Sequence, residues 1–138
     1  MEVSLLTPRL AAAYSLTARR IHDARHVSVL RSLDRRLVTT RPCLAEAFHL
    51  LRNFMGRPGQ AILLDWLEIG FLDVHESSEQ ENKRVYSLMR QYSDAPMDYA
   101  DASLVAAAKS IGVAQILAVD SRFYAYRLFG KTPFAVLP

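Results

Sequence analysis

One stretch, residues 97–123, restricts the fold of this chain more than any other. Its first half is rich in alanine, begins with Asp98 and Asp101 and ends at a glycine, which predicts an α-helix. The apolar run 116–119 then predicts a buried strand, and Asp120 follows it directly. A helix that leads into a fully apolar strand is typical of a parallel sheet, where ligands gather beyond the carboxyl ends of the strands. These acids therefore indicate a metal site at that edge of the sheet.

Strands and helices alternate along the rest of the chain. Short apolar or β-branched runs predict strands at 3–6, 36–40, 71–75, 116–119 and 133–137. Apolar spacing and capping residues predict helices at 10–20, 22–33, 42–56, 60–69, 78–92 and 98–112, with a break over the Gly-Arg-Pro-Gly sequence at 56–59. Helical connections of this length cross over a sheet and make its strands parallel. We expect an α/β fold, a three-layer α/β/α sandwich with a central, mostly parallel sheet of four or five strands.

Length and composition suit one soluble domain. The chain has 138 residues, of which 51% are hydrophobic, so we expect a single compact domain over 1–138. Its one cysteine, Cys43, cannot form a disulfide within the chain, which favours a reducing, cytoplasmic setting. Charges interrupt every apolar run well before the roughly 20 residues that cross a bilayer, so no membrane is expected.

A third acid can join the two at the predicted sheet edge. Glu46 lies one helical turn into the helix that follows strand 36–40, so it can reach the same edge as Asp101 and Asp120. These carboxylates would form an all-oxygen site, which Mg²⁺ and Mn²⁺ prefer and zinc does not. Such ions activate water and neutralise charge on a phosphodiester. Two simpler interpretations stay open: Asp98 could only cap its helix, and Glu46 could be a solvated helix residue.

Charge is distributed unevenly along the chain. Residues 1–60 contain ten arginines, no lysine and four acidic residues, whereas residues 61–138 contain seven basic and ten acidic residues. A basic half beside an acidic cluster suits a nuclease, in which arginines approach phosphates and carboxylates hold cations. An ordinary solvated surface, which could also meet an acidic protein, explains the charge equally well.

Three segments in this order and spacing resemble the PIN domain, in particular bacterial ribonucleases of the VapC toxin type: TTRPCLAEAFHLL, QYSDAPMDYADASLVAAAKSIGVAQILAVDSRF and YRLFGKTPFAVLP. The resemblance covers roughly residues 22–138. It implies that Glu46, Asp101 and Asp120 are the catalytic metal ligands, with Asp98 as an auxiliary acid. It also implies a Mg²⁺- or Mn²⁺-dependent nuclease that cuts RNA, forms a homodimer and is silenced by a cognate antitoxin protein.

The N-terminal segment 1–21 is atypical of that family. PIN domains begin with a strand that ends in an aspartate, whereas this chain has Val-Ser-Leu-Leu followed by Thr7. Arg122 likewise occupies a position where many relatives have a second acid after the fourth strand. Three interpretations follow: a weak nuclease toxin, a catalytically impaired PIN domain that binds RNA or a protein without cleavage, or an N-terminus altered from an active ancestor, for example by a reading-frame change. An unrelated flavodoxin-like module is a further alternative, although the chain has no glycine-rich phosphate loop.

Overall fold

The central feature of the computed structural model is a parallel sheet. The structure describes residues 2–6, 35–94, 97–113, 115–117, 127–128, 132–133 and 135–137. Five strands form the sheet in the order β3-β2-β1-β4-β7, and every neighbouring pair is parallel. These strands are β1 Glu2–Leu6, β2 Arg35–Thr40, β3 Leu72–His75, β4 Gln115–Leu117 and β7 Ala135–Leu137. A separate antiparallel pair consists of β5 Arg127–Leu128 and β6 Thr132–Pro133.

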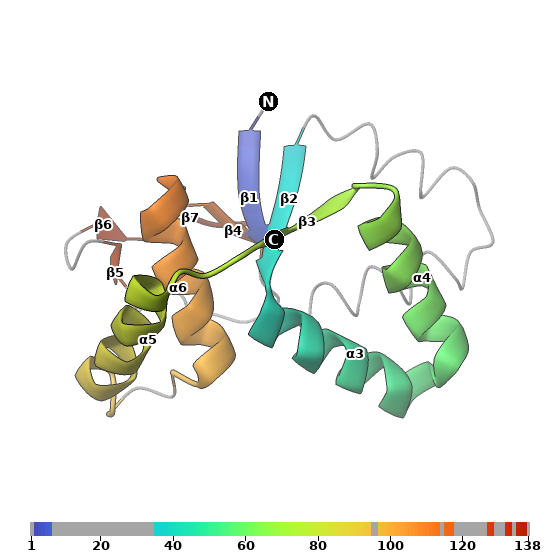
Figure 1. Cartoon of the computed structure of the whole chain (residues 1–138), viewed down its shortest axis with the longest axis horizontal. Coiled ribbons are helices and arrows are strands. Elements are labelled where there is room, and N and C mark those ends of the chain that lie inside the picture. The colour runs from blue at the N-terminus through green and yellow to red at the C-terminus, as the bar shows by residue number, and fades with distance from the viewer. Residues whose placement is uncertain are drawn as a thin grey trace.

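Helices cover both faces of this sheet (Figure 1). The described helices are α3 Arg41–Met55, α4 Arg57–Glu68, α5 Glu79–Gln91 and α6 Tyr99–Ile111. Successive residues of β2 point to opposite faces, so Leu37 packs in the core with α3 and α4 while Val38 packs in the core with α5 and α6. The predicted three-layer α/β/α sandwich with a parallel sheet is therefore confirmed.

Helix α6 is the most deeply buried element. Every residue from Ala100 to Ala108 is buried, and five of these nine are alanine. Small side chains allow the sheet, α3 and α5 to approach the helix closely, because alanine adds little beyond the helix backbone. Leu5 from the central strand β1 and Ile116 from its neighbour β4 belong to the same core.

Local signals set the ends of α5 and α6 as the sequence predicts. The Ser78 hydroxyl accepts the Glu81 N–H of α5 at 3.1 Å. The Asp98 carboxylate caps α6, and Gly112 ends it in the left-handed conformation at φ 70° and ψ 37°. Only one capping bond joins Ser78 and Glu81 in the described residues, because the Glu81 carboxylate bonds the His75 ring instead.

The junction between α3 and α4 differs from the prediction. A four-residue break was expected over 56–59, but only Gly56 lies outside a helix, and α4 begins at Arg57 rather than at residue 60. Pro58 is compatible with the first turn of a helix, where an N–H has no intrahelical partner. Gly56 alone turns the chain, at φ 67° and ψ −155°, and Gly59 is buried within α4.

Several predictions fall outside the described residues. They are the helices at 10–20 and 22–33, the end of the strand at 118–119, and the side chains of Thr7, Asp120 and Arg122. Within the part that the structure describes, no helix combines the length and apolar character needed to span a membrane.

Candidate active site

Asp98 and Asp101 lie together at the start of α6. Asp98 is exposed, and its Oδ1 accepts the backbone N–H of Asp101 at 2.8 Å. Asp98 is thus the N-cap of the helix, and it holds the first turn in place. Whether it also assists a metal stays a prediction.

Asp101 is only 1% exposed. A buried carboxylate is rare, because removing its charge from water costs several kcal/mol unless cations or hydrogen-bond donors surround it. The first turn of α6 compensates in part, because the helix dipole places partial positive charge there. Its position at the start of α6 is the one that the sequence predicts for a cation ligand, and that role stays a prediction.

A chain of hydrogen bonds joins the start of α3 to the start of α6. The Ser103 hydroxyl donates to the Ala100 carbonyl at 2.7 Å, so its single hydrogen is used. Thr40 must therefore donate in the 2.6 Å bond between the Thr40 and Ser103 hydroxyl oxygens. The Thr40 oxygen in turn accepts the Cys43 N–H at 3.4 Å, which caps α3. This chain fixes the position of α3 relative to α6.

The Cys43 thiol lies within the same contact, 3.5 Å from the Ala100 carbonyl oxygen that accepts its hydrogen. Burial raises the pKa of this thiol to about 11, and the negative charge of Asp101 contributes to the rise. The thiol is therefore neutral near pH 7 and supplies no thiolate, which is the form that binds soft metals. The carboxylate oxygens of the predicted ligands instead match hard cations, which prefer oxygen.

The predicted ligands are only partly brought together. Glu46 lies on α3, three residues after Cys43, and is partly buried. It and Asp101 therefore belong to two helices whose first turns are in contact through Cys43 and Ser103. Asp120, the third predicted ligand, lies outside the described residues. Among the residues that the structure does describe, no three His, Cys, Asp or Glu side chains form a metal-binding group, so the three-acid site stays a prediction.

Strand β1 has no acid at the edge where the family carries one. Leu5 pairs with Val38 and with Ile116, so β1 lies between β2 and β4 at the centre of the sheet. Its one acid, Glu2, is the first residue of the strand, at the opposite edge and about 13 Å from Leu6 along the strand. Glu2 therefore cannot replace the missing aspartate. Thr7, the next residue after β1, lies outside the described residues.

Two side-chain contacts at the carboxyl ends of β2 and β3 have no signature in the sequence. Arg41 donates to Glu76 through Nε at 2.9 Å and also through Nη2, and these bonds lower the pKa of the Glu76 carboxyl. His75, at the end of β3, bonds Glu81 at 2.8 Å through Nε2. Partners 35 residues apart leave no spacing pattern in a sequence. Only the position of His75 at the end of a predicted strand hinted at its location.

An α/β sandwich with acids at helix starts beyond the carboxyl ends of parallel strands is the architecture of many hydrolytic and nucleotide-binding domains. The comparison with family models is specific: the chain belongs to the PIN domain family, whose model matches residues 11–128. The match begins after β1, so it does not include the strand that lacks the acid.

Two solved structures share the fold. VapC20 of Mycobacterium tuberculosis, described as a toxin that cleaves the sarcin-ricin loop, has a TM-score of 0.65 and 17% identity over 87% of this chain and 91% of its own. A toxin–antitoxin complex from Klebsiella pneumoniae has a TM-score of 0.57 and 12% identity over 98% of this chain and 96% of its own. A comparison with curated proteins found no match.

Proposed function

We propose that residues 1–138 form a single metal-dependent endoribonuclease domain, the toxin of a toxin–antitoxin pair. The observation that carries this proposal is Asp101, a carboxylate buried in the first turn of α6 within a PIN domain. The fold shared with VapC20, an RNA-cleaving toxin by its description, supports RNA as the substrate.

In this proposal Glu46, Asp101 and Asp120 hold Mg²⁺ or Mn²⁺, and Asp98 assists. The bound ions would activate the attacking water and neutralise charge on the cleaved phosphodiester. Asp98 keeps the first turn of α6 formed through its bond to the Asp101 N–H. The bond between Thr40 and Ser103 keeps Glu46 on α3 in a fixed position relative to Asp101 on α6.

One observation favours a second function, a catalytically impaired PIN domain that binds RNA or a protein without cleavage. The described part of β1 has no acid at its carboxyl end, and Thr7 follows it. With Thr7 in place of aspartate the proposed metal site would lose one anionic ligand, and Arg122, where many relatives have an acid, would lower its negative charge further.

Cleavage of RNA by the purified chain distinguishes the two functions. We expect cleavage with Mn²⁺, none with EDTA, and a loss of at least about 100-fold in Asp101→Asn, because a ligand charge is removed from the metal site. Asp94→Asn is the matched control, since it removes the same charge from an exposed turn. Activity that persists in EDTA or in Asp101→Asn contradicts the metal nuclease. An inert chain that Thr7→Asp activates supports the impaired domain.

The proposed partners are a cognate antitoxin and a second copy of the chain. The Klebsiella pneumoniae neighbour was solved as a toxin–antitoxin complex, and this supports an antitoxin partner for the present chain. Light scattering on the purified chain should give twice its mass of 15.6 kDa. A mass of 15.6 kDa at all concentrations contradicts the homodimer.

A further inference from the structure

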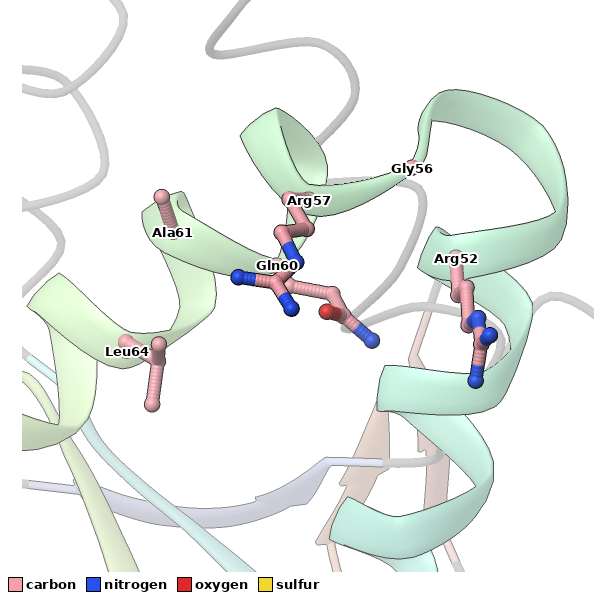
Figure 2. Close-up of a pocket in the computed structure, with 6 residues that line it drawn as sticks. All are labelled: Arg52, Gly56, Arg57, Gln60, Ala61 and Leu64. Carbon is pink, nitrogen blue, oxygen red and sulfur yellow. The ribbon is translucent and has the colours of Figure 1, made fainter.

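A groove of about 710 Å³ lies between α3 and α4. The helices diverge like the arms of a V from their junction at Gly56 (Figure 1). Figure 2 shows Arg52 on α3 and Arg57 on α4 at the two sides of the opening, with Ala61 and Leu64 further along α4. The described residues that line the groove are Arg52, Gly56, Arg57, Gln60, Ala61 and Leu64.

The charge of this α3–α4 groove is positive. Arg52 and Arg57 are exposed, and neither forms an ion pair with another described residue. Arg36 and Arg41 differ, because Asp73 and Glu76 neutralise them. Within residues 41–64 the only acid is Glu46, and Asp65 follows Leu64 without lining the groove. Within the described part of the chain, no carboxylate therefore neutralises these two arginines.

The walls of the groove are held in place independently of these arginines. The Gln60 side chain on α4 donates to the Phe48 carbonyl on α3 at 3.1 Å and so ties the two helices together. No side chain caps the N-terminus of α4, where the helix dipole adds partial positive charge beside Arg57. A groove with fixed walls and two guanidinium groups suits phosphate, which arginine binds through paired hydrogen bonds.

The location of the groove favours RNA over an acidic protein. Arg52 follows Glu46 by six residues on the same helix, which places it about 9 Å further along the axis of α3. Six residues turn the helix by about 240°, so Arg52 lies on a different face of α3 from Glu46, and an RNA strand bound at Glu46 and Asp101 would bend around α3 to reach the groove. An RNA strand carries one charge per nucleotide, so it can present a phosphate to each of the two arginines.

We infer that the α3–α4 groove binds phosphates of single-stranded RNA next to the cleavage site, through Arg52 and Arg57. This inference rests on the proposed function, because RNA is the proposed substrate. It adds a second contact region that is separate from the acids.

The test measures RNA binding by the full chain in a Glu46→Gln background, which prevents cleavage. The probe is a fluorescein-labelled 12-nucleotide oligouridylate, and fluorescence anisotropy gives its affinity between 50 and 200 mM KCl. Arg52→Gln with Arg57→Gln should lower the salt slope by about 1.4, that is 0.7 for each lost phosphate contact. The loss of affinity should then be about sevenfold greater at 50 mM than at 200 mM salt. Arg90→Gln, an exposed arginine in the last turn of α5, is the matched control and should change neither value.

The outcomes separate this inference from the proposed function. If the double variant has the same RNA affinity and salt slope as the Glu46→Gln parent, the α3–α4 groove does not bind RNA. This holds even if the chain with Glu46 cleaves RNA. If the chain with Glu46 does not cleave RNA but RNA binding depends on both arginines, the α3–α4 groove binds RNA as inferred. The proposed nuclease activity is then contradicted. Binding of an oligoglutamate peptide that depends on both arginines, with RNA binding unaffected, overturns the inference and assigns the groove to an acidic protein.

Discussion

Replacement of Thr40 by valine tests the contact between α3 and α6. Valine keeps the shape of the side chain, which is fully buried, but removes the hydroxyl that caps α3 and bonds Ser103. Loss of an N-cap costs about 1 kcal/mol, and loss of the buried hydrogen bond costs about 1 kcal/mol more. Ser103 keeps its bond to the Ala100 carbonyl, so no hydroxyl hydrogen is left without an acceptor. The free energy of unfolding should therefore fall by about 2 kcal/mol.

Thermal unfolding followed by circular dichroism measures this loss. A chain of 138 residues has an unfolding entropy of about 0.29 kcal/mol per kelvin. A loss of about 2 kcal/mol should lower Tm by about 7 °C. Thr40→Ser keeps the hydroxyl and should recover most of this difference.

Ser78→Ala is the control for Thr40→Val. Ser78 caps α5 with one bond to the Glu81 N–H, but it is exposed, so its loss should cost only about 1 kcal/mol and lower Tm by about 3 °C. If Thr40→Val lowers Tm no more than Ser78→Ala does, the hydrogen bond between Thr40 and Ser103 contributes nothing to stability. The bond then does not fix α3 against α6.

Three further predictions concern single positions. Gly56→Ala should lower the free energy of unfolding in urea by about 2 kcal/mol, since φ 67° with ψ −155° suits only glycine. Gly112→Ala, in the left-handed region, should lower it by only about 1 kcal/mol, and equal losses would contradict this difference between the two conformations. The raised pKa of the Cys43 thiol means that above pH 9 the unfolded thiol releases its proton before the folded one. The free energy of unfolding, relative to that of Cys43→Ala, should therefore fall by roughly 3 kcal/mol between pH 9 and about 11; no pH dependence of this difference in urea unfolding contradicts the burial of a neutral thiol. Asp98→Ala should lower stability by about 1 kcal/mol through loss of the cap and should lower RNA cleavage less than Asp101→Asn does; an equal loss of cleavage would make Asp98 a ligand and not only a cap.

The sequence predicted those parts of the fold that local signals determine. Strand β2 was placed within one residue, and the caps Ser78 and Asp98 were identified because each bonds an N–H only three residues away. The one-residue junction at Gly56 was not predicted, since Gly-Arg-Pro-Gly is compatible both with a loop and with a helix that starts at Arg57.

The candidate site was less predictable than the fold. Asp101 was identified as a site residue from its position at a helix start, but its burial depends on the sheet and on helices from distant parts of the sequence. The bond between Thr40 and Ser103 joins residues 63 positions apart, and no pattern within either segment indicates it. The acid missing from β1 was recognised only by resemblance, because Val-Ser-Leu-Leu is an ordinary strand sequence.

The burial of α6 limits how this protein can change during evolution. From Ala100 to Ala108 each position is enclosed, so a larger side chain must displace a neighbouring strand or helix, at a typical cost of about 1–3 kcal/mol. Natural variation should therefore concentrate at the two exposed ends of the helix, at Tyr99 and at residues 109–111. One of those ends adjoins Asp98 and Asp101. A substitution at Tyr99, which the fold tolerates, therefore changes the surface directly beside the proposed site.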